Sequence, residues 1–110
     1  MELKVSKLQI NRFYYNPLPK NLTIAESDID GHGIFAKTDI GKNFDLGTTH
    51  IKVPMVHGYI RTPLGGFVNH STKNNCELHI IEEWDDYIIY NIFSSKKIKK
   101  GEEILLNYEN

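Results

Sequence analysis

The apolar residues of this chain come in short runs, and this pattern constrains its fold more than any other feature. The runs end at Gly, Asn, Asp or Pro and consist mainly of β-branched and aromatic residues, which are typical of strands. No stretch keeps a helical period for three turns. The sequence therefore predicts a mainly β protein with little helix.

The individual runs predict where the strands lie. We expect strands at 23–25 and 34–36, on either side of the turn "DIDGHG", and at 50–56, 59–60, 78–84, 87–93 and 104–108. The runs 78–84 and 87–93 predict a long hairpin with an acidic tip at 82–86. Solvation explains such a tip, and attraction of a basic peptide is the alternative. The N-terminal stretch "MELKVSKLQINRFYYNPLP" is open between a strand and a short helix.

Length and composition limit the organisation and the class of protein. A chain of 110 residues has room for one core and one site, so we predict a single domain over 1–110, with an extension at 1–20 and a core at 21–108. The net charge of −1 argues against a protein that coats nucleic acid or anionic membrane. No window approaches the run of about 18 apolar residues that spans a bilayer, and no secretory signal is visible.

Three separated motifs contain the glycines and polar side chains that could form a functional site. Gly31-His32-Gly33 lets the backbone approach a ligand, although a hairpin turn alone would explain it. "FVNHSTKNNC" at 67–76 places amide, imidazole and hydroxyl groups directly after an apolar pair, and by itself it reads as a polar turn. The stretch "IKKGEEILLNY" at 98–108 is, by itself, typical of an edge strand.

In this order, the three motifs closely resemble those of the SET-domain protein lysine methyltransferases, across roughly residues 22–108. The resemblance implies a β-clip of several short sheets with a C-terminal pseudoknot, in which the chain end threads through a loop and meets the second motif. It implies S-adenosyl-L-methionine as cofactor and, as substrate, a histone-like or other basic protein that presents a lysine. The short chain is similar in size to viral members, so we expect an intracellular protein, in the cytoplasm or a host nucleus.

The same resemblance assigns roles to residues of this chain. The backbone of Gly31, His32 and Gly33 would line the cofactor, and Asn69 and His70 would hold its amino group and adenine. The hydroxyl of Tyr108 would be catalytic, and Glu102 would brace the pseudoknot. The substrate channel would be walled by aromatic and apolar side chains, although an ordinary core role stays open for the aromatic ones. The candidates for these walls are Phe67, Tyr59, Leu78 and Tyr90.

An apolar channel suits the chemistry, because the amine that attacks a methyl group must be neutral. A free lysine is only about one part in a thousand neutral at pH 7.4. Desolvation lowers the pKa of an amine, and aromatic ring faces tolerate a nearby positive charge. A tyrosine such as Tyr108 can wall the channel and orient the amine, whereas a carboxylate there would favour the charged lysine.

The chain departs from the family pattern at several positions. Thr49 or His50 stands where many members have a tyrosine, Leu78 replaces a frequent channel aromatic, and Thr72 replaces a zinc-linked cysteine, so we expect no metal. The single cysteine, Cys76, is expected to be a small buried hydrophobe. The family's inserted segment and C-terminal extension are nearly absent. We therefore expect a second copy of the chain or the substrate to complete the site, with "RFYYNPLP" as the segment that reaches across.

Two other functions compete with this interpretation. The chain could be a SET-like binding module without turnover, because it lacks some channel aromatics. It could also be a small β protein that binds nucleic acid through its lysine-rich turn "SSKKIKKGEE", although two glutamates beside four lysines make a weak basic patch. Direct nucleic-acid binding is therefore not expected.

Overall fold

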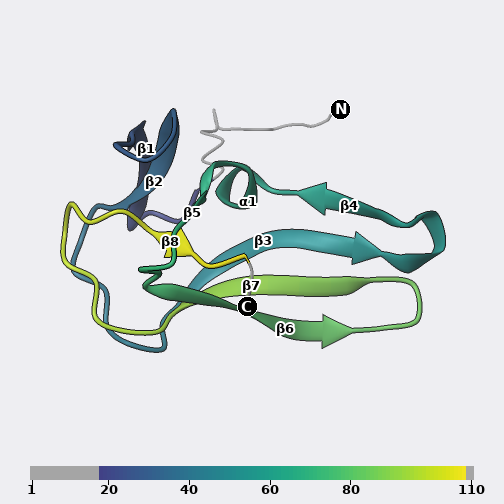
Figure 1. Cartoon of the computed structure of the whole chain (residues 1–110). Helices are drawn as coiled ribbons and strands as arrows, with labels where there is room; N and C mark the ends of the chain where they lie inside the picture. Colours follow the sequence, from purple (N-terminus) through teal and green to yellow (C-terminus); the bar gives the residue numbers. More distant parts are fainter. Residues whose placement is uncertain (1–17, 109–110) are drawn as a thin grey trace, which may run out of the picture.

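The computed structural model describes residues 18–108, and their regular structure is almost all β (Figure 1). This part of the chain has eight strands, one short α-helix and one 3-10 helix. The mainly β architecture predicted from the short apolar runs is confirmed. In chain order the elements are β1 (Leu22–Glu26), β2 (His32–Ala36), β3 (Asp45–Val53), η1 (Pro54–Val56), β4 (Gly58–Arg61), α1 (Pro63–Phe67), β5 (Asn69–His70), β6 (Cys76–Glu83), β7 (Ile88–Ser94) and β8 (Leu105–Leu106).

The strands form three small sheets. β1 and β2 make an antiparallel hairpin, and β3, β4, β6 and β7 form an antiparallel sheet in the order β4-β3-β7-β6. β5 and β8 pair in parallel, with Asn69 opposite Leu105 and His70 opposite Leu106. Figure 1 shows the four-stranded sheet as an arm that extends away from the other two sheets.

The predicted strand boundaries hold best for the hairpins. β6 and β7 form the expected long hairpin. The strand predicted at 50–56 instead starts at Asp45 and ends at Val53, because Pro54 has no N–H to donate to a ladder and begins η1. The strand predicted at 104–108 is reduced to Leu105–Leu106. The N-terminal stretch for which a strand or a helix was open lies mostly outside the described residues.

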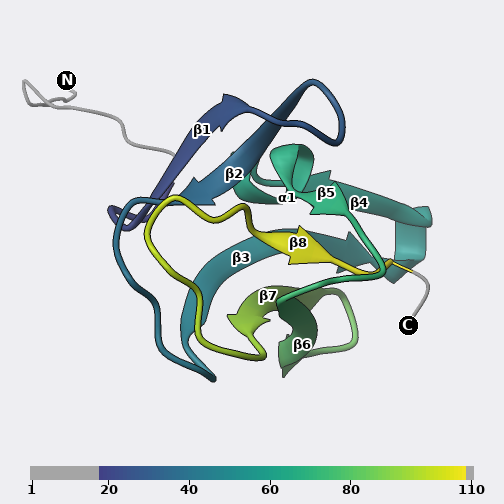
Figure 2. The ribbon, with the colours of Figure 1, turned by 60° about the vertical axis from the view of Figure 1, so that its left-hand side comes forward.

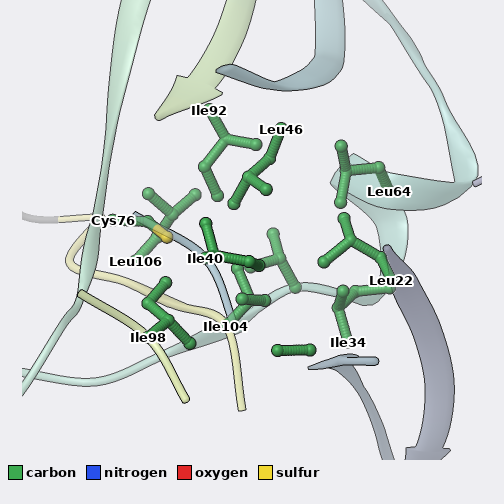
Figure 3. Close-up of a cluster of buried hydrophobic side chains, with 12 residues drawn as sticks. Leu22, Ile34, Ile40, Leu46, Leu64, Cys76, Ile92, Ile98, Ile104 and Leu106 are labelled. Carbon is green, nitrogen blue, oxygen red and sulfur yellow. The ribbon is translucent and has the colours of Figure 1, made fainter. Parts of the chain in front are cut away.

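The core lies where the three sheets meet (Figure 3). Leu22 and Ile34 come from the β1–β2 hairpin, Leu46 and Ile92 from the four-stranded sheet, and Leu106 from β8. Cys76 lies in the same cluster and is completely buried, as its interpretation as a small hydrophobe predicts. The buried cluster consists of Leu22, Ile34, Ala36, Ile40, Leu46, Leu64, Val68, Cys76, Ile92, Ile98, Ile104 and Leu106.

The segment between β5 and β6 closes around β8, which gives the predicted pseudoknot (Figure 2). The Ser71 amide donates to the Leu106 carbonyl at 2.8 Å, and the Asn75 amide donates to the Leu105 carbonyl at 3.2 Å. The Asn75 side chain makes two more bonds to the segment 103–105: Nδ2 donates to the Glu103 carbonyl at 2.8 Å, and Oδ1 accepts from the Leu105 amide at 2.9 Å. The second and third motifs are therefore neighbours.

No helix within residues 18–108 is long and apolar enough to cross a membrane.

Candidate active site

The Gly31–Gly33 turn is held against the pseudoknot. Gly31 has a φ of 47°, and its carbonyl accepts from the Ser27 amide at 2.8 Å, which closes the turn between β1 and β2. A Cβ on Gly33 would collide with Glu103 Oε2 and come within 3.0 Å of Asn69 Nδ2. A side chain at position 33 would therefore displace the Glu103 carboxylate from its place beside Asn69.

A carboxylate from the third motif connects these parts. Both carboxylate oxygens of Glu103 accept from Ser27 Oγ at 2.9 Å, and Oε2 also accepts from Asn69 Nδ2 at 2.8 Å. The bracing role predicted for Glu102 belongs instead to Glu103. Glu102 Oε1 accepts from the Lys99 amide at 2.8 Å and closes a surface turn.

Asn69 and His70 meet the first and third motifs from β5. Asn69 Nδ2 also donates to the carbonyls of Asp30 at 3.2 Å and His32 at 3.4 Å, whereas Oδ1 accepts no hydrogen bond from residues 18–108. His70 Nδ1 accepts from the Tyr108 amide at 3.0 Å, so in the neutral ring the proton is on Nε2. Asn69 Oδ1, an acceptor, and His70 Nε2–H, a donor, are therefore available to a ligand.

Tyr108 lies beside His70 and joins two regions. The two rings stack with centroids 5.7 Å apart and planes at 17°, and the Tyr108 hydroxyl donates to the Val68 carbonyl at 2.7 Å. Burial raises the pKa of Tyr108, and the charge of Arg61 partly opposes that rise. The hydroxyl is therefore protonated near neutral pH and can donate.

Tyr108 also lines a cavity of about 360 Å³. Of the four predicted channel residues, Tyr59 and Leu78 line it. Phe67 ends α1 with 41% of its surface exposed and is not among the lining residues, nor is Tyr90. The lining residues are Thr49, His50, Tyr59, Arg61, Gly65, Val68, Leu78, Leu106 and Tyr108.

His50 and Arg61 form the polar side of this cavity. They are paired across β3 and β4, and the His50 ring stacks on Tyr90 at 4.4 Å and meets Tyr59 edge-on at 5.3 Å. Burial, and then the charge of Arg61, lower the pKa of His50. Sequence reasoning missed Arg61, although the alternation of side chains along a strand puts positions 59 and 61 on one face.

Comparison with known proteins decides the family. The model of the SET domain family matches residues 47–109, which is more than half of the chain. The chain belongs to the SET domain family. No curated protein sequence matches this SET domain significantly.

Solved structures agree with the SET fold. The Plasmodium falciparum protein PFL0690c, described as a candidate histone methyltransferase, is 21% identical, with a TM-score of 0.66 over 83% of this chain and 95% of that one. The Chaetomium thermophilum polycomb repressive complex 2 is 20% identical, with a TM-score of 0.63 over 81% of this chain. The match covers only 15% of that polycomb chain. These similarities show a shared fold.

SET domains typically use S-adenosyl-L-methionine, and the donor set here fits that molecule. Asn69 Oδ1 can accept from an ammonium group, and His70 Nε2–H can donate to a ring nitrogen. A Cβ built on Gly31 would have no heavy atom within 4 Å, so this turn leaves open space for a ligand. Within residues 18–108, no group of three or more His, Cys, Asp or Glu side chains could hold a metal ion.

Proposed function

We propose that this SET domain is an S-adenosyl-L-methionine-dependent protein-lysine N-methyltransferase. The observation that supports this most is the position of Tyr108. Its backbone and ring contact His70, one of the proposed cofactor residues, and Tyr108 also lines the 360 Å³ cavity. One residue thus touches both of the places where the two reactants would bind.

The proposed cofactor residues would bind S-adenosyl-L-methionine through complementary hydrogen bonds. Asn69 Oδ1 would accept from its amino group, His70 would hold the adenine, and the backbone of Gly31, His32 and Gly33 would line its amino-acid part. The bound cofactor would supply a methyl group on a sulfonium, which a neutral amine can attack.

Protein groups around the cavity would position that amine. The Tyr108 hydroxyl and the Val68 carbonyl lie 2.7 Å apart and could both hydrogen-bond an amine, orienting its lone pair. Tyr59 and Leu78 would contact the aliphatic part of the lysine. No carboxylate among residues 18–108 lines the cavity, so none there would favour the charged form of lysine.

A basic protein segment is the proposed substrate class. The hairpin tip carries four exposed carboxylates, Glu82, Glu83, Asp85 and Asp86, which would attract such a segment. One Chaetomium thermophilum polycomb structure is described in complex with H3K27me3 and H3K27M. We extend the same substrate class, a histone-like tail, to this chain.

Replacing Tyr108 by Phe tests the proposal. Because this removes only the hydroxyl, we expect methyl transfer to a lysine peptide library, measured by mass spectrometry, to fall by about 100-fold or more. Binding of S-adenosyl-L-methionine, measured by calorimetry, should be retained. Tyr59→Phe is the matched control, since Tyr59 lines the same cavity and its hydroxyl bonds no residue of 18–108.

The outcome separates an enzyme from a binding module. If the wild-type protein binds the cofactor but transfers methyl groups to no lysine peptide, it is a binding module without turnover. The departures from the family pattern at Thr49, His50 and Leu78 leave that alternative open. Full transfer by Tyr108→Phe would contradict the role given to its hydroxyl.

We also propose that a second copy of the chain, or the substrate itself, covers the open side of the cavity. The support is the exposure of its rim, because Tyr59 is 65% and Tyr108 53% exposed. The segment expected to reach across, 12–19, lies mostly outside the described residues.

A further inference from the structure

Arg61, an exposed residue, places a positive charge at the rim of the proposed lysine cavity. It ends β4, lines the cavity, and forms no ion pair with any residue of 18–108. A site for a cationic side chain would more simply carry a carboxylate. This cavity carries a guanidinium, which is always protonated at physiological pH.

The other titratable groups near the cavity do not cancel this charge. The other titratable residues that line the cavity are His50, Tyr59 and Tyr108, and none of them is a carboxylate. The carboxylate of Glu77 on β6 lines an adjoining cavity that shares Leu78, Leu106 and Tyr108, and its Oε1 lies 3.4 Å from His79 Nε2. The remaining titratable groups on the surrounding strands are Asp45 and Lys52 on β3, His70 on β5, Cys76, Glu82 and Glu83 on β6, and Tyr90 on β7. Asp45 begins β3, where its Oδ1 accepts from Asn91 Nδ2 at 2.9 Å.

The charge of Arg61 reaches both walls of the cavity. On β3 it adds to burial in lowering the pKa of His50, and beside β8 it lowers the pKa of Tyr108 against the effect of burial. A lysine amine between these walls would experience the same field, and its protonated form would be repelled.

We propose that Arg61 makes this cavity admit the substrate lysine as a neutral amine. The inference rests on the proposed function and adds a positioning role to it, since Arg61 acts on the protonation of the amine and not on the methyl group. Desolvation in an aromatic channel disfavours the ammonium, and a fixed cation at the cavity disfavours it further. Arg61 has little effect on the binding of the uncharged amine.

Steady-state kinetics of Arg61→Gln test the inference. Without the guanidinium, protonated lysine would occupy the cavity unproductively, so at pH 7 kcat and KM should both fall by about tenfold, the effect of one pKa unit. The ratio kcat/KM should not fall, because the free neutral amine is unaffected and the positive charge that develops on its nitrogen in the transition state is repelled less. The kcat profile should shift about one pH unit upward. Lys20→Gln, which removes a positive charge beside a different cavity, should change none of these.

Two opposite results would overturn the inference. An increase in KM would mean that Arg61 binds an anionic group of the substrate. A fall in kcat/KM at unchanged pH dependence would mean that Arg61 only supports the structure.

Two measurements test Arg61 without turnover. In Arg61→Gln the pKa of His50, followed by NMR, should rise. Calorimetry with a lysine peptide should show wild-type affinity that increases from pH 7 to pH 9.5, with a weaker increase in the variant. Unchanged His50 titration and unchanged peptide pH dependence would refute the inference. If the wild type transfers no methyl group to any peptide, the proposed function fails, while these two readouts still report on Arg61.

Discussion

Burial is the main reason why Cys76 is an unreactive thiol. The residue is completely buried in the core beside β8. Burial, and then the nearby charge of Glu77, raise the pKa of Cys76 to about 12, although a hydrogen bond with the Leu105 backbone opposes part of this rise. Because the thiolate is the nucleophile, the folded protein presents almost none of it near neutral pH.

We predict that Cys76 of the native protein does not react with a thiol reagent within an hour at pH 8, and reacts within minutes after unfolding in guanidinium chloride. The raised pKa also makes the stability of the protein depend on pH. The unfolded thiol ionises near its ordinary value of about 8.5, and the folded one only near 12. The unfolded state therefore loses its proton first, and the free energy of unfolding should fall between those pH values. Cys76→Ala should reduce that fall. Rapid labelling of the native protein would contradict this account.

Side chains of the site could be predicted from the sequence where a motif defines them. Tyr108 was expected to meet Asn69 and His70, and the structure places it against His70, which follows Asn69 on β5. The choice between Glu102 and Glu103 could not be predicted, because adjacent residues of an extended segment point to opposite sides and the sequence does not show which side faces Ser27. Arg61 was missed for a similar reason, since its place at the cavity depends on the pairing of β3 with β4.

At the scale of elements, the closure of the β5–β6 segment around β8 controls the geometry of the site. β8 has only two residues, so its ladder alone contributes few hydrogen bonds. The side chains of Glu103 and Asn75 supply the additional bonds that fix it. Removing one of these buried or half-buried partners should therefore affect both stability and the position of Asn69.

Glu103→Gln tests this dependence. The substitution places an amide group, which donates, against Ser27 Oγ and Asn69 Nδ2, so we expect the free energy of unfolding in urea to fall by about 1–3 kcal/mol. The affinity for S-adenosyl-L-methionine should also fall, because Asn69 loses its anchor.

Glu102→Gln is the matched control, since that neighbouring carboxylate closes only a surface turn. It should change the free energy of unfolding by less than about 0.5 kcal/mol. Equal effects of the two substitutions would show that Glu103 has no special role in the pseudoknot.

The strands themselves could largely be predicted from the sequence. The β1–β2 and β6–β7 hairpins follow from apolar runs on either side of polar turns. The boundaries of β3 and β8 could not be predicted from the sequence. The pairing of β3 with β7 contains two irregularities, and β8 depends on contacts from a distant segment. Such long-range pairing has no local signal in the sequence.

At the scale of the whole molecule, the exposed rim of the cavity bears on whether one chain is sufficient for activity. If a second copy covers Tyr59 and Tyr108, activity per molecule should fall on dilution through the dissociation constant of the pair. We expect light scattering to show a dimer at the concentrations where specific activity is full. A monomer with constant specific activity on a short peptide would contradict the second copy and favour closure by the substrate.

The closure around β8 also has a consequence for synthesis. Residues 103–108 follow every other described element along the chain, yet they complete the contacts of Gly33, Asn69 and His70. A ribosome-bound chain that has released only residues 18–102 would therefore have its hairpins but no assembled centre. Competence to bind the proposed methyl donor should arise abruptly, when residues 103–108 leave the exit tunnel.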